Sequence, residues 1–139
     1  MMIIEKFTQI YQRLNKDNLE LLTDLYSADI TFIDPLHTIE GIDNLTVYFA
    51  GLYDNVSSIS FDFEEVTSDK NSHFITWDMT LAHSKMNGGR PYIVPGVTHL
   101  KTNEEGQIDY HRDYYDAGQM LYQQIPLIGS IIRLIKRRL

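Results

Sequence analysis

The sequence predicts an α+β fold in which helices pack on one face of a curved antiparallel sheet, so that the sheet forms a cone. Apolar residues recur at spacings of three and four through most of the first 52 residues, and they alternate with polar residues between residues 57 and 115. Helices followed by antiparallel strands are typical of this class. The chain has 139 residues, 43% of them hydrophobic, so we expect one core and a single domain over residues 1–139.

Three helices are expected before the main run of strands. A helical period over residues 3–15 ends at the polar residues 15–18 and restarts over residues 19–26 as a shorter second helix. These two helices should form a hairpin. A third helix follows Gly41, with Asp43 available to cap its start.

Five strands and a final helix complete the predicted order. The β-branched and aromatic run 30–33 is a short strand, which Pro35 ends because proline lacks a backbone donor and restricts Asp34 to extended geometry. Two hairpins and a C-terminal helix follow, with strands over residues 57–67, 73–81, 92–101 and 107–115 and an amphipathic basic helix over about 126–139.

Charge and composition exclude several classes of protein. The 19 acidic and 12 basic residues give a net charge of −7, which argues against broad nucleic-acid binding because that depends on neutralising phosphates. The absence of cysteine removes thiolate and disulfide chemistry and favours a reducing cytoplasm. The first residues are typical of a helix and not of a signal peptide, and no apolar run approaches the about 20 residues of a transmembrane helix.

The basic tail has two interpretations. Residues 1–132 carry a net charge of −11, whereas Arg133, Lys136, Arg137 and Arg138 follow with no acid among them. The tail is either a final helix that covers the mouth of the cone, with its cations at a helix C-terminus, or an anchor on the surface of a membrane.

The last strand should place His111, Asp113 and Tyr115 on one face, together with Trp77 and Met79 of a neighbouring strand. A four-residue turn over 103–106 would pair Thr98 with His111 and Gly96 with Asp113. That pairing would leave space over Gly96 for a ligand beside Asp113. A slip of one residue would instead turn these side chains outward.

Two stretches resemble a known family. Residues 25–35, Gly41 and Tyr48-Phe49 resemble the signature of the nuclear transport factor 2-like superfamily, particularly its SnoaL-like and ketosteroid-isomerase-like members. Residues 106–108 and 112–116 resemble a turn and last strand of SnoaL-like proteins and limonene-epoxide hydrolases. The resemblance implies a cone-shaped sheet with a pocket at its mouth, but the superfamily hosts several chemistries and non-catalytic modules.

Each analogy is incomplete at the level of residues. By resemblance to ketosteroid isomerases Asp34 is the general base, yet the positions of the two oxyanion donors fall on Ile10 and Thr98. By resemblance to epoxide hydrolases Asp113 is one acid of a triad, whose other two positions fall on Trp77 and Met79. We therefore expect neither steroid isomerisation by that mechanism nor epoxide hydrolysis.

Asp34, His37, His111 and Asp113 remain as candidates for proton chemistry, and each also has a structural interpretation. Asp34 is either a pocket carboxylate or a turn residue, His37 either a relay or an ordinary loop histidine, and Asp113 either catalytic or part of a structural pair with His111 or Arg112. Their spacing lacks a compact metal-ligand pattern, so no metal is expected. The expected pocket lining, which has a plain core as its alternative, is Tyr26, Phe32, Trp77, Met79, Gly96, Thr98 and Tyr115.

These expectations combine into one functional hypothesis. The protein is expected to be a homodimer that pairs through the opposite sheet face, which carries Val97, His99, Tyr110, Arg112 and Tyr114. It should bind a small hydrophobic carbonyl or hydroxyl compound and, if it is an enzyme, catalyse isomerisation, cyclisation or dehydration without a cofactor. Asp34 would then be the base, Asp113 or His111 the acid or orienting group, and Tyr115 a hydroxyl donor. A non-catalytic ligand-binding or protein-interaction module is the alternative.

Overall fold

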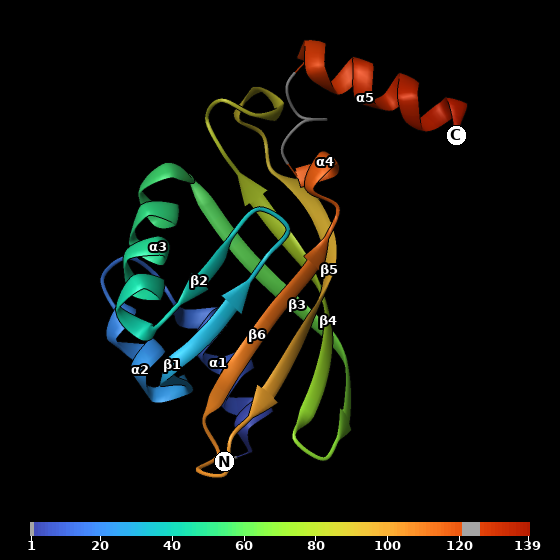
Figure 1. Ribbon diagram of the computed structural model, residues 1–139. Coiled ribbons are helices and arrows are strands. Elements are labelled where there is room, and N and C mark those ends of the chain that lie inside the picture. The colour runs from blue at the N-terminus through green and yellow to red at the C-terminus, as the bar shows by residue number, and fades with distance from the viewer. Residues whose placement is uncertain (1, 121–125) are drawn as a thin grey trace.

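A computed structural model of the chain describes residues 2–120 and 126–139 (Figure 1). The elements are α1 (Ile3–Arg13), η1 (Leu19–Leu21), α2 (Leu22–Leu25), β1 (Tyr26–Ile33), β2 (Thr38–Glu40), α3 (Ile42–Asn55), β3 (Ser58–Asp69), β4 (Ser72–Ala82), η2 (Asn87–Gly89), β5 (Tyr92–Thr102), β6 (Ile108–Tyr115), α4 (Ala117–Met120) and α5 (Pro126–Arg138). None of the helices in the described ranges is long and apolar enough to cross a bilayer.

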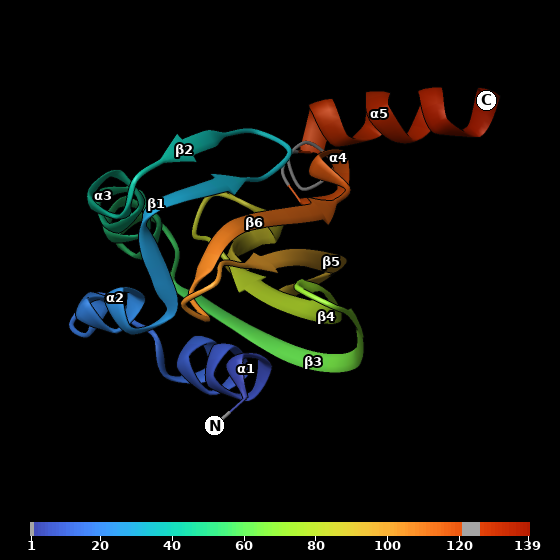
Figure 2. The same ribbon diagram turned by 60° about the horizontal axis from the view of Figure 1, so that its bottom comes forward.

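The strands form one curved sheet in the order β2-β1-β6-β5-β4-β3, and α1 to α3 lie along one side of it (Figure 2). The predicted α+β fold with a cone-shaped sheet is confirmed. The strand pairs are antiparallel except for β1 with β6, which run parallel. Because β1 and β6 share a direction, the residues that leave their ends emerge at the same end of the sheet.

β1 is longer than the sequence predicted. Tyr26, assigned above to the second helix, instead has extended backbone and opens the strand, where it pairs with Ile108. Five residues of β1 then span only two of β6, from Tyr26 to Thr31, so the strand bends sharply there. This bend lets Tyr26 and Phe32 both contact the same inward side chain, His111.

The sequence prediction missed β2. Three residues, 38–40, pair with residues 31–33 of β1, so residues 34–37 form a hairpin turn instead of an open loop. The backbone N–H of Asp34 donates to the carbonyl of His37 at 3.0 Å and closes the turn. Gly41 then adopts a φ of 87°, which favours glycine, before α3 begins.

The predicted pairing of the second hairpin was wrong by two residues. Thr98 lies opposite Asp113, and Gly96 lies opposite Tyr115. One residue of the difference comes from the turn, which extends to Gln107: the Asn103 N–H donates to the Gln107 carbonyl, and the Gly106 N–H donates to the Asn103 carbonyl within the turn. The other comes from a bulge at Asp109, where Thr102 pairs with Ile108 but Lys101 pairs with Tyr110. Two shifts of one residue leave the faces unchanged, so His111, Asp113 and Tyr115 still share the inner face.

The buried side chains form two clusters. The larger cluster packs α1, α2 and α3 on β1 and the middle of the sheet, and its members include Phe7, Leu25, Leu45 and Leu100. The smaller one consists of Trp77, Met79, Leu81 and Val94, towards the other end of the sheet. Phe61 and Phe63 pack against both clusters. The two clusters do not merge, and this leaves room between them.

Candidate functional site

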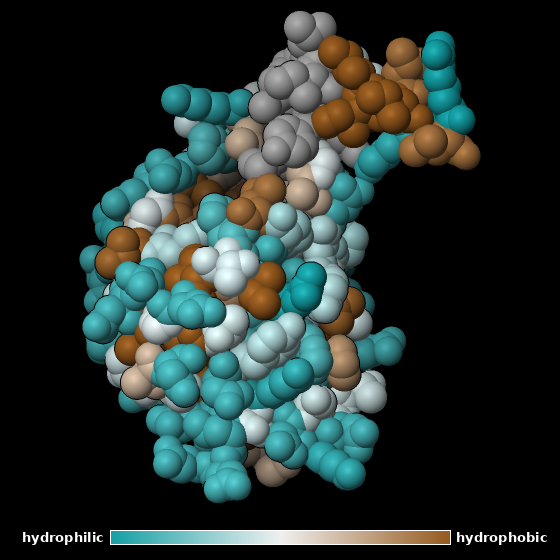
Figure 3. Space-filling view, in the orientation of Figure 1, coloured by the Kyte–Doolittle hydropathy of each residue, from teal (hydrophilic) through white to brown (hydrophobic). Residues whose placement is uncertain are grey.

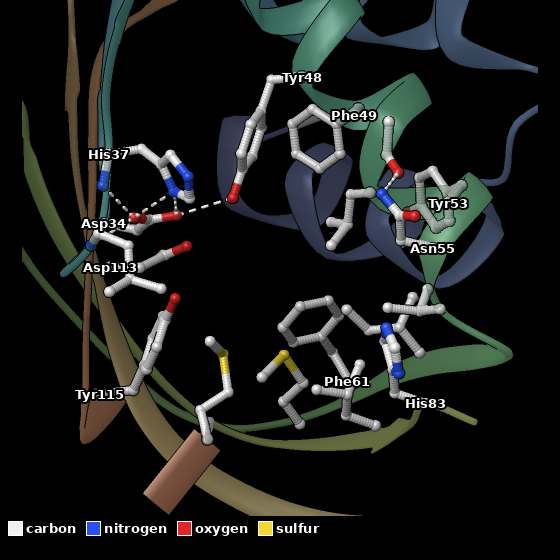
Figure 4. A pocket seen from close by; sticks show the side chains of 18 of the residues that line it. Asp34, His37, Tyr48, Phe49, Tyr53, Asn55, Phe61, His83, Asp113 and Tyr115 are labelled. Carbon is white, nitrogen blue, oxygen red and sulfur yellow. Dashed lines mark hydrogen bonds and ion pairs between the residues drawn. The ribbon is translucent and has the colours of Figure 1, made fainter. Parts of the chain in front are cut away.

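A cavity of about 710 Å³ lies between α3 and the inner face of the sheet. Its walls are mostly apolar and include Phe49, Phe61, Trp77 and Met79. Both carboxylates of the cavity, Asp34 and Asp113, lie at one end of it, from the turn after β1 and from β6 (Figure 4). Ligand pockets commonly measure about 300–1,000 Å³, so this volume suits a small organic molecule.

The carboxylate of Asp34 is engaged by its own turn. Its Oδ1 accepts the backbone N–H groups of Leu36 at 2.8 Å and of His37 at 2.7 Å. The His37 ring contributes Nδ1 at 3.1 Å from Oδ1, and the Tyr48 hydroxyl donates to Oδ2 at 2.8 Å. A carboxylate offers about four acceptor sites. Asp34 therefore lines the cavity and at the same time holds the hairpin turn, with most of its acceptor capacity used.

Two tyrosine hydroxyls stand beside the carboxylates. Burial raises the pKa of Tyr48, and the adjacent charge and hydrogen bond of Asp34 raise it further. Burial also raises the pKa of Tyr115, with additional contributions from the charges of Asp34 and Asp113. The hydroxyl of Tyr115 points towards the carboxylates and makes no hydrogen bond within the described residues (Figure 4). Tyr115 is thus a neutral donor available to a ligand.

Asp113 keeps one oxygen free. Its Oδ1 accepts the Thr98 hydroxyl at 2.6 Å and the Nε2–H of His111 at 2.7 Å. Its Oδ2 has no hydrogen-bond partner in residues 2–120 or 126–139. It is not fully buried, because no fully buried side-chain N or O atom there lacks a partner. Figure 4 shows the carboxylate directed into the cavity.

A line of hydrogen bonds runs from Asp113 into the core. Nδ1 of His111 lies 2.7 Å from the Tyr26 hydroxyl, which lies 2.6 Å from the Tyr11 hydroxyl. The ionised carboxylate can only accept, so Nε2 of His111 donates to it. In a neutral imidazole Nδ1 then accepts from Tyr26, and Tyr26 accepts from Tyr11. Burial raises the pKa of both tyrosines, which keeps these donors protonated.

Trp77 occupies the space that the sequence predicted to be open over Gly96. A Cβ at Gly96 would overlap the indole ring, so the missing side chain makes room for Trp77 and not for a ligand. The indole N–H donates to the Thr98 hydroxyl at 2.8 Å, and that hydroxyl donates to Asp113. Trp77 thereby forms a cavity wall and also orients a donor to Asp113.

The predicted site residues divide into two groups, those that line the cavity and those that lie behind its wall. Asp34, His37, Asp113, Phe32, Trp77, Met79 and Tyr115 line the cavity. Tyr26, His111, Gly96 and Thr98 do not line it; they lie behind its wall, and all but Gly96 belong to the hydrogen-bond network. Among the described residues, no group of three or more His, Cys, Asp or Glu side chains is arranged to hold a metal.

The predicted site residues include neither Tyr48 nor Tyr11, although Tyr11 is next to Ile10, the position at which the resemblance to ketosteroid isomerases expects a donor. Both occupy positions on the apolar stripe of a helix, where an aromatic residue is usually core. The only signal was the hydroxyl that each would bring into the core, since a buried tyrosine hydroxyl usually has a partner. Asp34 and Tyr26 are those partners.

The sequence profile of the SnoaL-like domain matches residues 7–111, which is most of the chain. No curated protein matches the sequence.

Several solved structures have the same fold. One is a protein from Jannaschia sp. CCS1, provisionally described as a SnoaL-like polyketide cyclase, with a TM-score of 0.76, 17% identity and coverage of 90% of this chain and 92% of that one. Another is a protein of ketosteroid isomerase-like fold from Catenulispora acidiphila, in complex with trimethylamine, with a TM-score of 0.75, 21% identity and coverage of 89% and 93%. A third is TerC, co-crystallised with polyporic acid, with a TM-score of 0.73, 12% identity and coverage of 85% and 94%.

The identities to these structures are low, so they establish the fold alone. The profile match over residues 7–111 establishes the family, and the curved sheet over an apolar cavity agrees with it. The chain belongs to the SnoaL-like domain family, within the nuclear transport factor 2-like fold.

Proposed function

We propose that the protein binds a small hydrophobic carbonyl or hydroxyl compound in the cavity and moves a proton next to the carbonyl, in an isomerisation, cyclisation or dehydration that uses no cofactor. The free Oδ2 of Asp113 carries this proposal. A carboxylate oxygen without a partner, facing an apolar cavity, is placed to take a proton from carbon and to return it. The two donors on Oδ1 hold the carboxylate in orientation.

Tyr115 is the proposed partner of Asp113. Proton abstraction next to a carbonyl develops negative charge on the carbonyl oxygen, and a neutral hydroxyl near that oxygen stabilises the charge. The raised pKa of Tyr115 keeps its proton in place for this role. Asp34 was the expected base, but its hydrogen bonds to Leu36, His37 and Tyr48 occupy most of its acceptor sites. We therefore propose Asp113 as the base, while Asp34 shapes the polar end of the cavity.

The proposal is tested in two steps. In the first step, native mass spectrometry of the protein after exposure to a hydrophobic metabolite extract identifies a retained compound. In the second step, the exchange of that compound's C–H hydrogens in D₂O is followed in the presence of a catalytic amount of the protein. Asp113→Asn should retain the compound but slow the exchange by about 10²–10⁴-fold. Asp109→Asn, the same change on the same strand and outside the cavity, should match the wild type. Unchanged exchange in Asp113→Asn would remove Asp113 from the reaction.

One observation favours a non-catalytic ligand-binding module as the second candidate. No lysine or arginine is among the residues described as lining the cavity, so the neutral Tyr115 would stabilise a developing oxyanion without help from a cation. A retained compound that shows no exchange with the wild-type protein would support this candidate.

The outer face of the sheet supports a further part of the proposal, pairing of two copies. Phe74, Ile93 and Tyr114 are 41%, 55% and 48% exposed there. The Phe74 ring stacks on the His99 ring, with 4.2 Å between the ring centroids. Exposed apolar and aromatic side chains of this kind are typical of an interface core. Sedimentation velocity of the purified chain should show a dimer.

A further inference from the structure

The C-terminal helix α5 exposes one apolar side. Ile131, Leu134 and Ile135 are 52%, 45% and 54% exposed. Their spacing of three and four puts them on the same side of the helix. Figure 3 shows apolar surface, in brown, on α5 where the helix extends beyond the body of the molecule. A side chain exposed in this way loses the stabilisation that burial would give it, so the apolar side is expected to have a partner.

Among the described residues, a hydrogen bond joins the polar side of α5 to the body. Lys136 Nζ donates to Asp116 Oδ2 at 2.7 Å, just beyond the end of β6. This contact lowers the pKa of Asp116. Because the polar side holds the helix to the body, the apolar side is left pointing elsewhere. Of the described α5 side chains, those of residues 129–138, none lines the cavity. None of these side chains therefore covers the mouth of the cone, which is the role that one of the two sequence interpretations gave to the helix.

The charge of the segment favours an anionic partner. The four basic residues of residues 117–139 all lie in 133–139, and residues 117–139 contain no acid. The rest of the chain, residues 1–132, carries a net charge of −11. Arg137 and Arg138 are exposed and make no ion pair within the described part of the chain. Lys136 and Arg137 follow the apolar residues at positions that flank the apolar side. A helix with an apolar side flanked by cations is the pattern of a segment that lies in the surface of an anionic bilayer.

We propose that α5 docks the protein on an anionic membrane surface. The apolar side enters the boundary between headgroups and acyl chains, and the cations at its flanks and C-terminal end contact acidic headgroups. The acidic body is repelled by the same surface, which directs contact to α5. The helix lies at the end of the molecule where α4 and the loop after β4 contribute Met120 and Met86 to the cavity (Figure 1).

Co-sedimentation with vesicles tests the proposal. The full chain should bind vesicles of phosphatidylcholine containing about a third phosphatidylglycerol, and should bind pure phosphatidylcholine much less. The double variant Arg137→Gln/Arg138→Gln should lower the partition coefficient by about fivefold for each charge removed. Ile135→Ser should lower it by about tenfold. Added salt should weaken binding to the anionic vesicles.

Matched controls lie on the body. Arg13→Gln/Lys16→Gln removes two exposed charges near the end of α1, and Val66→Ser removes an apolar side chain that is 49% exposed on β3. Both controls should bind vesicles like the wild type. Equal binding to the two kinds of vesicle, or an equal loss in the controls, would overturn the proposal. Sedimentation velocity in which Ile135→Ser lowers the oligomeric state would assign the apolar side to a second copy, and would also overturn it.

Discussion

The two carboxylates of the cavity are held in opposite ways. Asp34 receives most of its hydrogen bonds from residues two and three positions later in the chain, and within the described ranges only Tyr48 donates from another element. Asp113 receives its hydrogen bonds from Thr98 on the neighbouring strand and from His111, which continues to Tyr26. The first cluster is almost local in sequence, whereas the second needs the assembled sheet.

This difference indicates which carboxylate is available for chemistry. The tight turn brings two backbone N–H groups to Oδ1 of Asp34, and the Tyr48 hydroxyl donates to its Oδ2, so both oxygens are engaged. A carboxylate on a strand points across the sheet, and its donors in this protein converge on Oδ1 alone. The other oxygen stays open to the cavity. The comparison predicts that Asp34 contributes mainly to stability and Asp113 mainly to reaction.

The largest effect on stability is expected at Asp34. Asp34→Ala removes the acceptor for two backbone N–H groups and the Tyr48 hydroxyl, and should lower the free energy of unfolding by about 2–3 kcal/mol. Asp34→Asn keeps an oxygen that can accept from the backbone, so we expect a loss of about 1 kcal/mol. Urea unfolding measures both. If Asp34→Asn abolished proton exchange while Asp113→Asn did not, the two roles would be reversed.

A smaller effect is expected at Tyr26, in the network behind Asp113. Tyr26→Phe leaves the buried Tyr11 hydroxyl and His111 Nδ1 without their shared partner, at a cost of about 1–2 kcal/mol in urea unfolding. Tyr110→Phe is the matched control, because the Tyr110 hydroxyl makes no hydrogen bond within the described residues. A change equal to that of the control would mean that the network adds nothing to stability.

The smallest effect concerns Tyr115, which stands near both carboxylates. Its pKa is raised by burial and by the charges of Asp34 and Asp113, so the folded state holds the proton above the usual pKa of about 10. The stability from this group is present below that pH and is lost as pH rises towards the folded value. The loss should approach about 1 kcal/mol per pH unit.

Urea unfolding at a series of alkaline pH values measures the slope. Tyr115→Phe should give a shallower slope than the wild type, since one titrating group has been removed. Burial raises the pKa of Tyr48 and raises that of Tyr53 to about 12. Both tyrosines should therefore continue to contribute to the slope in the variant. Identical slopes would contradict the burial of Tyr115 beside the carboxylates.

The sequence predicted the fold class and the faces of the last strand, because both depend on periods of hydrophobicity that survive local irregularities. The inward side of β6 was predicted although its pairing was not, since the longer turn and the bulge at Asp109 each shift the register by one residue and together restore the faces. Neither the bulge nor the short strand β2 has a strong sequence signal. Both depend on how a few residues pair with the strand just before them, β1 in the case of β2 and β5 in the case of the bulge.

The polar contacts of the candidate site were less predictable. The turn that engages Asp34 follows from the residues after it and could be anticipated from Asp34 and Pro35. The bond from Tyr48 to Asp34 and the line from His111 to Tyr11 could not, because each requires two elements to pack in a particular position. Likewise, glycine at position 96 indicates a close approach but does not say whether a ligand or Trp77 makes it.

The position of β6 links the cavity to the order of synthesis. β6 is the last strand along the chain, yet it lies in the middle of the sheet, between β1 and β5. A chain that has emerged from the ribosome only to residue 107 can form the antiparallel ladder β3-β4-β5. Without β6, however, no strand connects β1 to that ladder, and Asp113 is absent. Pairing that joins distant parts of a chain forms late. Ligand retention by the nascent protein would therefore begin only after the final strand has docked, and can serve as a readout of completed folding.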